Sequence, residues 1–439
     1  MNFQSFYKDK RVLVTGHTGF KGSWLTEWLL MMGAKVTGLA LPPATEPALF
    51  DQLGLAGRCD HRIGDIRDRV LVRKVIHDVR PDLIFHLAAQ PLVRLSYAQP
   101  VETYETNVMG TAHVLDALRD ADWPCAAVMI TTDKVYENHE QGRAYQESDP
   151  LGGYDPYSSS KACAELVIQT YRQSFFNPEK IQKEFEQKLA KNAKEEGGIA
   201  AGGDKKTSSL RASRSSVQNL PIIGVASARA GNVIGGGDWA QDRIVPDCMR
   251  ALAKGEIIAV RNPNATRPWQ HVLEPLSGYL LLGMKLFEEL NVRRETLDVT
   301  SKTDYSSRLT SNVSHLTPRV SHLTPHVSHL TSYSSSFNFG PPLFSSRPVR
   351  DLVEEILKNW AGRWEDRSDP GALHEAGLLN LATDKAFEVL GWKPHWDFAK
   401  TLSMTVTWYK AVHEGGASVV QELVQAQIGE YAENSVDKE

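Results

Sequence analysis

Short apolar runs alternate with amphipathic stretches along the first half of the chain. Arg11–Thr15 is a β-branched run, and an amphipathic stretch follows from Ser23 to Met32, with Gly33 placed as a helix stop. Later apolar runs lie at Lys35–Ala40, Ile63–Ile66, Leu83–Leu87, Ala127–Thr132 and Ile222–Arg229. Strands that alternate with helices predict a doubly wound, parallel α/β sheet of the Rossmann type. Such sheets bind their ligands at the carboxyl ends of the strands.

The turn after the first run carries three evenly spaced glycines. Gly16, Gly19 and Gly22 lie between the predicted strand and the predicted helix, which is the context that a dinucleotide fingerprint requires. We expect Gly16 to permit the tight turn, Gly19 to let the backbone approach a pyrophosphate, and Gly22 to allow close helix–strand packing. The pyrophosphate would then lie at the helix N-terminus.

The position that usually selects between NAD and NADP carries neither of the expected side chains. Leu41-Pro42-Pro43 follows the second strand, where an acid normally holds the adenosine ribose. No arginine for a 2′-phosphate stands there either, so NAD is mildly favoured. Asp65, after the third strand, is a candidate ligand for the adenine amino group, and the small Ala88 after the fourth strand leaves room for a cofactor.

Tyr157 and Lys161 are four residues apart in what reads as the first turn of a helix. This spacing puts both side chains on one helix face, where the lysine cation would favour the phenolate and lower the tyrosine pKa. The alternative is an ordinary exposed lysine beside a packed tyrosine. Asp133 and Lys134 follow the fifth strand, past its carboxyl end, so they would face the same cleft.

Composition narrows the class of protein. The chain has 439 residues, of which 41% are hydrophobic and 23% charged, and it is long enough for two core-bearing lobes. A net charge of −4 gives no indication of a nucleic-acid or membrane surface. The N-terminus has no signal-peptide pattern and no apolar run reaches spanning length, so we expect a cytoplasmic protein. The four cysteines lack CxxC spacing and are expected to be reduced packing residues.

Two polar segments interrupt this pattern, at residues 177–220 and 292–336. The second contains a seven-residue repeat with histidines at His315, His322 and His329. Three such units are too short for a packed repeat architecture, and the polar, low-complexity setting favours disorder over a metal site. Each segment joins a predicted helix to the following strand, at the sheet edge opposite the ligands, where long insertions cost little closure entropy. We therefore expect poorly ordered insertions, no metal and an intact active site.

Longer sequence motifs resemble those of a known family, and the resemblance covers the chain from about Lys10 to Tyr409. The fingerprint, Thr132 and the Tyr157/Lys161 pair resemble the extended short-chain dehydrogenase/reductase superfamily. Within it the chain resembles the CDP-glucose 4,6-dehydratases in four strings: His86-Leu-Ala-Ala-Gln-Pro-Leu-Val-Arg-Leu-Ser-Tyr97, Gly152-Gly-Tyr-Asp-Pro-Tyr-Ser158, Arg229-Ala-Gly-Asn-Val-Ile-Gly-Gly-Gly-Asp-Trp239 and Arg267-Pro-Trp-Gln-His-Val-Leu-Glu-Pro-Leu276. Sugar-nucleotide dehydratases generally carry Asp-Glu after the threonine of the fifth strand, whereas Asp133-Lys134 of this chain resembles the CDP-glucose branch.

The resemblance implies a redox-neutral dehydration of CDP-glucose by a retained NAD. Tyr157 would take the proton of the C4 hydroxyl as hydride leaves C4, Lys161 would hold the nicotinamide ribose, and Thr132 would hydrogen-bond the same hydroxyl. Asp133 would protonate the departing C6 hydroxyl. Lys134 would be either the base that removes the C5 proton or an electrostatic stabiliser of the enolate. Hydride then returns to C6 and gives CDP-4-dehydro-6-deoxyglucose.

The remaining site residues follow from the fingerprint and the resemblance together. Cofactor contacts are expected from Gly16, Thr18, Gly19, Phe20, Gly22, Asp65, Ile66, Leu87, Ala88, Ala89, Gln90, Asn107, Tyr157 and Lys161. Substrate contacts are expected from Arg94, Asn232, Arg243 and Arg267, since a guanidinium matches phosphate oxygens. A homodimer through 101–119 and 157–172 is implied by the family alone. The alternatives left open are another nucleotide-sugar 4,6-dehydratase, a 4-epimerase and a non-catalytic NAD-binding protein.

These predictions give a domain organisation with two lobes and two insertions. We expect an NAD-binding domain at 1–176 and 221–235, a flexible insertion at 177–220, a smaller α/β substrate-binding lobe at 236–291 and 337–415, a low-complexity insertion at 292–336, and a polar C-terminal tail with a short helix at 416–439.

Overall fold

A computed structural model describes residues 3–139, 142–177, 180, 223–309, 333–342, 345–368 and 378–435 of the chain. Its centre is a seven-stranded sheet in the order β12-β7-β5-β4-β1-β2-β3, in which every neighbouring pair is parallel. The strands are β1 (Arg11–Thr15), β2 (Lys35–Ala40), β3 (Asp60–Ile63), β4 (Leu83–His86), β5 (Cys125–Ile130), β7 (Ile223–Arg229) and β12 (Ser336–Asn338). The predicted Rossmann-type α/β fold is confirmed.

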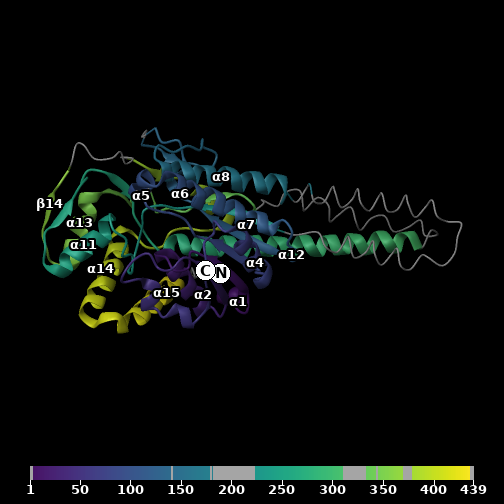
Figure 1. Ribbon diagram of the computed structural model, residues 1–439, viewed down its shortest axis with the longest axis horizontal. Helices are drawn as coiled ribbons and strands as arrows, with labels where there is room; N and C mark the ends of the chain where they lie inside the picture. Colours follow the sequence, from purple (N-terminus) through teal and green to yellow (C-terminus); the bar gives the residue numbers. More distant parts are fainter. Residues whose placement is uncertain are drawn as a thin grey trace.

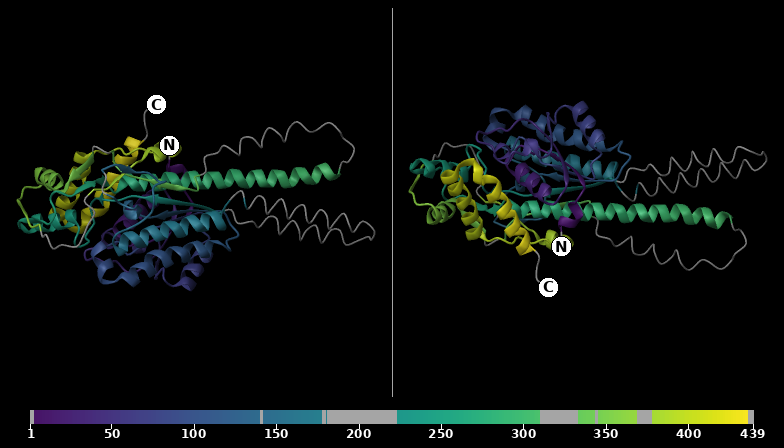
Figure 2. Two further views of the ribbon diagram at one scale, coloured as in Figure 1. Left: turned by 90° about the horizontal axis from the view of Figure 1, so that it is seen from above. Right: turned by 90° about the horizontal axis from the view of Figure 1, so that it is seen from below.

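Helices cover both faces of this sheet (Figures 1 and 2). The main covering helices are α2 (Phe20–Met31), α4 (Arg69–Val79), α7 (Gly110–Leu118), α8 (Pro156–Ser174) and α12 (Leu273–Leu309). Val12 and Val14 of β1 pack into one core with α2 and α12, whereas Leu13 packs into the other core with α4, α7 and α8. Strands buried on both faces read as continuous apolar runs, which explains why the sequence pattern located them.

Short strand pairs and further helices lie beyond the carboxyl edge of the sheet, toward the left of Figure 1. The pairs join β10 to β13, β11 to β8, β14 to β9 and β15 to β6. The elements of this part are β6 (Ala144–Tyr145), β8 (Val233–Ile234), α11 (Ile244–Lys254), β9 (Ile258–Val260), β10 (Thr266–Pro268), β11 (Gln270–His271), β13 (Ser346–Pro348), α13 (Val349–Asn359), β14 (Trp364–Asp366), β15 (Asn380–Leu381), η5 (Ala386–Leu390) and α14 (Phe398–Gly415). The remaining elements are α1 (Phe3–Tyr7), α3 (Leu49–Gln52), η1 (Leu55–Gly57), α5 (Val93–Ala98), α6 (Pro100–Tyr104), η2 (Glu105–Met109), η3 (Asp133–Val135), η6 (Gly416–Val419) and α15 (Val420–Ser435).

The helix α12 is longer than the sequence pattern predicted. The insertion expected at 292–336 would have ended the helix before residue 292, but it continues to Leu309 and projects from the body of the molecule (Figure 1). Between residues 284 and 309 the sequence holds no glycine or proline that would end a helix, and Glu289 pairs with Arg293 one turn later. The first part of the expected insertion at 292–336 is therefore helical. Residues 181–222 and 310–332, which hold the other insertion and the histidine repeat, lie outside the described residues.

The C-terminal segment contains the expected helix, but the helix packs against the core and does not form a polar tail. The α15 side chains of Val420, Val424, Ile428 and Tyr431 are buried against the main core. Their spacing of four, four and three residues forms one apolar helix face. The Tyr431 hydroxyl also donates to Glu274 Oε2 at 2.6 Å, which ties α15 to the start of α12.

Candidate active site

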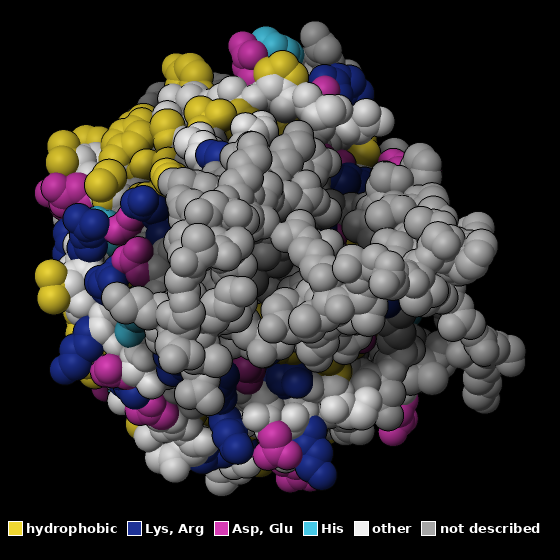
Figure 3. Space-filling view, turned by 90° about the vertical axis from the view of Figure 1, so that its right-hand side faces the viewer, with side chains coloured by type: hydrophobic (Ala, Val, Ile, Leu, Met, Phe, Trp, Pro, Cys, Tyr) yellow, Lys and Arg dark blue, Asp and Glu magenta, His cyan; other side chains and the backbone are white. Residues whose placement is uncertain are grey.

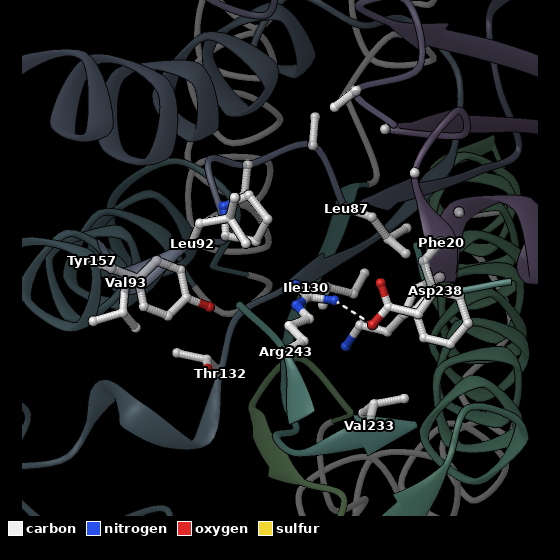
Figure 4. Close-up of a pocket in the computed structure, with 18 of the residues that line it drawn as sticks. Phe20, Leu87, Leu92, Val93, Ile130, Thr132, Tyr157, Val233, Asp238 and Arg243 are labelled. Atoms are coloured by element: carbon white, nitrogen blue, oxygen red, sulfur yellow. Dashed lines mark hydrogen bonds and ion pairs between the residues drawn. The ribbon is translucent and has the colours of Figure 1, made fainter. Parts of the chain in front are cut away.

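A cavity of about 820 Å³ opens at the carboxyl ends of the central strands. Figure 4 shows Tyr157 and Thr132 on one side of it, and Phe20 and Asp238 on the other. Most of the predicted site residues line this cavity: Gly16, Thr18, Gly19, Phe20, Gly22, Asp65, Ile66, Leu87, Ala88, Ala89, Arg94, Thr132, Asp133, Lys134, Tyr157, Lys161, Asn232, Arg243 and Arg267. The fold thus brings together segments from distant parts of the sequence.

The glycine-rich turn has the geometry that a dinucleotide-binding turn needs. Gly16 has a φ of +77°, in the left-handed region that glycine tolerates best. A Cβ at Gly22 would lie 2.1 Å from the Gly16 carbonyl oxygen, so α2 packs directly against the turn. Gly19 caps α2 without any side-chain hydrogen bond, and the first residues of the helix line the cavity. The backbone N–H groups of the first turn of α2 would stabilise an anionic group.

Tyr157 lies in the first turn of α8, and local hydrogen bonds set its direction. Asp155 accepts a hydrogen bond from the Ser158 backbone N–H at 2.9 Å and so caps the helix. The Tyr157 backbone N–H donates to Ser96 Oγ at 3.1 Å, which fixes α8 to α5. Figure 4 shows the phenol oxygen directed toward Thr132 at the end of β5.

The protonation of the Tyr157/Lys161 pair differs from the expectation. Burial raises the pKa of Tyr157 to about 12, and a hydrogen bond with Thr132 offsets only part of this shift. Burial also lowers the pKa of Lys161 to about 8, against the influence of Glu165. The Lys161 ammonium donates to the Ile130 carbonyl oxygen at 3.2 Å. The expected lowering of the tyrosine pKa by Lys161 is therefore not found for the protein alone, because desolvation of the phenolate dominates and the cation that opposes it is Arg243.

A buried acid one helical turn after Lys161 was not anticipated from the sequence. Glu165 accepts hydrogen bonds from Thr131 Oγ1 at 2.5 Å, from Ser227 Oγ at 2.8 Å and from Arg229 Nη2 at 2.9 Å. Its negative charge raises the pKa of Lys161 and so favours the protonated amine. The available signal was the four-residue spacing from Lys161 to Glu165 on the face that carries Tyr157.

The acid at the end of β5 is held on both carboxylate oxygens. Thr132 Oγ1 donates to Asp133 Oδ1 at 2.9 Å, and Asn232 Nδ2 donates to Asp133 Oδ2 at 3.0 Å. Asp133 is only 1% exposed, and a Cβ at Gly231 would lie 1.9 Å from its carboxyl carbon. Asn232 lines the cavity as predicted, but its amide nitrogen is engaged by Asp133 instead of being directed to a sugar or diphosphate.

Lys134 is half-buried and lines the same cavity. Within the described part of the chain, no hydrogen bond or ion pair engages its ammonium group. Lys134 thus follows Asp133 in the short helix η3 with a side chain that a ligand can contact. The geometry is compatible with either of the two roles expected for it.

Two of the predicted substrate arginines are held by acids. Arg243, the N-cap residue of α11, donates from Nη1 to Asp238 Oδ2 at 2.8 Å, as drawn in Figure 4. Arg94 Nη1 lies 3.5 Å from Asp242 Oδ1, and both side chains are about half exposed. Arg267 of β10 lines the same cavity. The three arginines come from different segments that line one cavity, so their guanidinium groups are candidates for binding a diphosphate.

Two predicted cofactor residues do not line the cavity. Asn107 Oδ1 accepts from the Gln90 backbone N–H at 2.8 Å, and its Nδ2 donates to Ser160 Oγ at 2.8 Å. Gln90 Nε2 donates to Thr103 Oγ1 at 2.9 Å. These bonds tie the loop after β4 to α6 and α8. The Gln90 and Asn107 side chains thus hold this loop in place, and their contact with a cofactor stays a prediction.

The cavity also holds a lysine that sequence reasoning did not single out. Lys21, the second residue of α2, lines it and donates from Nζ to the Tyr279 hydroxyl at 3.4 Å. The pKa of Lys21 is lowered to about 8, mainly by burial and to a smaller extent by the charges of Lys161 and Arg243, against the opposing charge of Asp133. The available signal was a charged residue inside the glycine fingerprint.

The described residues show neither a metal-binding cluster nor a membrane-spanning helix. They contain no group of three or more His, Cys, Asp or Glu side chains that could hold a metal ion. His315, His322 and His329 of the repeat lie outside this part of the chain. Across the same described ranges, none of the helices combines the length and apolar character needed to cross a membrane.

Comparison with known proteins places this fold and site in a family. The family model for GDP-mannose 4,6 dehydratase matches residues 13–186. A dTDP-glucose 4,6-dehydratase of Streptomyces venezuelae, solved with NAD and TYD bound, shares the fold with a TM-score of 0.63 at 21% identity, over 91% of this chain and 97% of that one. A CDP-glucose 4,6-dehydratase of Salmonella typhimurium is 40% identical over 412 residues, or 93% of this chain and 92% of the relative. This identity extends over nearly the full length of both proteins, and the chain therefore belongs to the CDP-glucose 4,6-dehydratase family.

Proposed function

We propose that the chain converts CDP-glucose to CDP-4-dehydro-6-deoxyglucose and water, as an NAD-dependent hydro-lyase. The observation that carries this proposal is the meeting of two side-chain pairs in one cavity. Tyr157 and Lys161 are a pair suited to hydride chemistry at a hydroxyl, and Asp133 and Lys134 supply the further acid–base groups that water loss requires. The full-length similarity to a CDP-glucose 4,6-dehydratase supports the choice of substrate.

The cavity fits a dinucleotide at the glycine-rich turn. The N-terminus of α2, which has no side-chain cap, would hold the pyrophosphate, and Asp65 and Ile66 line the end suited to the adenosine. NAD, when bound, accepts a hydride from C4 and returns it to C6, and its nicotinium charge favours the Tyr157 phenolate. Lys161 would hold the nicotinamide ribose and orient it against the sugar.

Tyr157 is the base for the first proton transfer. Its phenolate takes the proton of the C4 hydroxyl, and Thr132, which lies beside the phenol ring, hydrogen-bonds the same hydroxyl. The phenol is otherwise neutral at physiological pH, because burial raises its pKa to about 12. Proton removal from the substrate therefore depends on positive charge close to the phenolate.

Asp133 and Lys134, which follow β5, carry out the elimination. Asp133 donates a proton to the departing C6 hydroxyl, and Thr132 and Asn232 hold its carboxylate in place. Lys134 either removes the C5 proton or stabilises the enolate that this removal creates. Arg243, Arg267 and Arg94 bind the diphosphate of the substrate, and Arg243 is oriented by its ion pair with Asp238.

The protein works as a cytoplasmic homodimer in this proposal. Helices α5, α6 and α8 and the neighbouring segment η2 carry exposed apolar side chains: Leu95, Val101, Tyr104, Met109 and Leu166. Figure 3, viewed from the end toward which α12 projects, shows hydrophobic side chains gathered on one flank. Such a surface is suited to a second copy of the chain. The sheet would form the NAD-binding domain, and the segments 236–291 and 337–415 the substrate lobe.

Product formation from defined sugar nucleotides tests the proposal. The full-length protein is incubated with CDP-glucose and NAD, and the 4-keto product is followed by its near-ultraviolet absorbance in alkali. Parallel incubations use dTDP-glucose, UDP-glucose and GDP-mannose. A signal with another nucleotide sugar but not with CDP-glucose would contradict the substrate. Conversion to a C4 epimer without a keto product would favour an epimerase.

A further inference from the structure

A buried carboxylate on α8, Glu165, has no role in the proposed reaction. It is 2% exposed. It stands four residues after Lys161 and eight after Tyr157, so the three side chains lie on one face of the helix. Tyr157 and Lys161 line the cavity, whereas Glu165 lies outside its lining. The helix face that begins with the reacting phenol therefore continues into a buried acid.

Three consecutive residues at the end of β5 and just after it contact this face of α8. The Ile130 carbonyl oxygen accepts from Lys161 Nζ at 3.2 Å, and Thr131 Oγ1 donates to Glu165 Oε1 at 2.5 Å. The side chain of Thr132 hydrogen-bonds the phenol at the start of the same face. Because the contacts come from successive residues, a shift of α8 along β5 would break them together.

The second oxygen of the Glu165 carboxylate is held by the neighbouring strand β7. It accepts from Ser227 Oγ at 2.8 Å and from Arg229 Nη2 at 2.9 Å. Burial acts to raise the pKa of Glu165, but the charge of Arg229 and these hydrogen bonds lower it. The acid is therefore ionised and joins α8 to the ends of both β5 and β7.

The charged and titratable groups that face Lys161 come from three helices and strands. Lys21 of α2 is a second cation, and His86 of β4 is neutral because burial lowers its pKa to about 3. On α8 itself, Tyr157 is neutral because burial raises its pKa to about 12. Among the described residues, Glu165 is the anion whose charge opposes the burial of Lys161. Buried charges are screened weakly, so this interaction acts across one helical turn.

We propose that Glu165 is a positioning residue for the proposed reaction, which fixes α8 against β5 and β7 and keeps Lys161 in its charged form. A charged ammonium donates stronger hydrogen bonds to the hydroxyls of a nicotinamide ribose than a neutral amine does. Glu165 acts through Lys161 and exchanges no proton with the substrate. This inference rests on the proposed NAD-dependent function.

A double-mutant cycle over a range of pH measures the effect of Glu165 on Lys161 without catalysis. Urea unfolding is followed from pH 6 to pH 10, without cofactor, for the full-length wild type, Glu165→Gln, Lys161→Met and the double variant. Below the folded-state pKa of Lys161 the buried ammonium bears its full desolvation penalty, and the penalty is relieved as the pH rises through that pKa. The stability difference between each protein and its Lys161→Met partner therefore begins to change at that pH. Lys21 is present in all four proteins, so its own titration is common to them.

We expect this change to begin near pH 8 in the wild-type pair and at least about one pH unit lower in the Glu165→Gln pair. Ser227→Ala removes a hydrogen bond to Glu165 but keeps its charge, and this control should leave the onset at the wild-type pH. Equal onsets in the wild-type and Glu165→Gln pairs overturn the proposal. Glu165→Gln leaves the buried Arg229 charge unpaired, so the cycle is repeated with Glu165→Gln/Arg229→Met, and this background decides by the same criterion if the single variant does not fold.

Kinetics with CDP-glucose and NAD connect this charge to the reaction. The alkaline limb of the pH profile of kcat should move to lower pH in Glu165→Gln and stay in place in Ser227→Ala. An alkaline limb that does not move, together with a shifted unfolding onset, overturns the positioning role. A wild type that is inactive on CDP-glucose at every pH refutes the proposed function instead, whereas the unfolding cycle still decides whether Glu165 sets the charge of Lys161.

Discussion

Asn232 donates from its side-chain amide to the Asp133 carboxylate, with 3.0 Å between Nδ2 and Oδ2. The two residues are 99 positions apart in the sequence and meet because β5 and β7 are neighbours in the sheet. Asn232 has a φ of +51°, a conformation that asparagine and aspartate tolerate better than most residues. The bond makes Asn232 a positioning residue for the proposed acid of the elimination.

Asn232→Asp should impair elimination more than C4 oxidation. The new carboxylate keeps the backbone conformation but faces Asp133, and two carboxylates at this distance do not both ionise readily. We expect kcat to fall about 10- to 100-fold, while CDP-glucose still produces a transient of reduced nicotinamide absorbance. Stopped-flow absorbance separates the two steps. Asn359→Asp at the end of α13 is the matched control, and an equal loss in that control would refute the assigned role.

Gly231→Ala should displace Asp133. The added Cβ would lie 1.9 Å from the carboxyl carbon, so the acid or the loop must move. We expect at least a ten-fold loss of kcat and a stability cost of about 1–3 kcal/mol. Gly429→Ala in α15, where a Cβ meets nothing within 4 Å, should keep full activity and stabilise the protein by up to about 1 kcal/mol. Steady-state kinetics and urea unfolding of both variants check this, and wild-type kcat in Gly231→Ala would contradict it.

Lys161→Met should stabilise the protein at neutral pH while abolishing activity. The pKa of Lys161 is lowered from 10.5 to about 8 by burial. Below pH 8 the amine is charged in both the folded and unfolded states, so the folded state bears the full desolvation penalty. That penalty is relieved as the pH rises from about 8 to 10.5, because the folded state loses its proton first. Lys161→Met removes the penalty, so we expect it to raise the free energy of unfolding at pH 7 by about 1–3 kcal/mol, and the gain to shrink above pH 8.

Urea unfolding at pH 7 and pH 9.5, without added cofactor, measures this difference. The exposed Lys254→Met at the end of α11 is the control and should change the free energy of unfolding by less than about 0.5 kcal/mol at either pH. A Lys161→Met variant that is less stable than the wild type at pH 7 would show that burial does not penalise this charge.

Tyr431→Phe should weaken the attachment of the C-terminal helix. Its hydroxyl donates to Glu274, which is buried and whose pKa burial raises to about 7. Loss of this donor should reduce the free energy of unfolding by about 1–2 kcal/mol and leave kcat unchanged, since α15 does not line the cavity. Tyr104→Phe on the partly exposed α6 is the control. Unfolding in denaturant together with kinetics decides the outcome, and a loss of activity without a loss of stability would contradict it.

Local patterns in the sequence predicted the sheet and most of the cavity. The apolar runs of β1, β4 and β5 are buried on both faces, so their hydrophobicity is continuous and visible without the fold. The fingerprint and the Tyr157/Lys161 pair are likewise local, because a turn or one helical turn sets their geometry. The same kind of local signal was present but overlooked in α15, whose four apolar residues are spread among polar ones.

Contacts between distant segments could not be predicted in this way. The hydrogen bond from Asn232 to Asp133 forms only because β5 pairs with β7. Asn107 lies outside the cavity lining and donates a hydrogen bond to Ser160 of α8. The raised pKa of Tyr157 has the same origin, because desolvation is a property of the assembled cavity and not of the four-residue spacing. Motif positions alone therefore indicated the chemistry but not the protonation states.

The most direct test of the proposed reaction follows the hydride itself. CDP-glucose labelled with deuterium at C4 is converted by the full-length protein in the presence of unlabelled NAD, and the product is examined by NMR spectroscopy and mass spectrometry. A hydride that leaves and returns within one active site places the deuterium at C6 of CDP-4-dehydro-6-deoxyglucose, with none in solvent or in the free nicotinamide pool. Deuterium retained at C4 of a CDP-hexose, or released into free NADH, would contradict the proposed intramolecular dehydration.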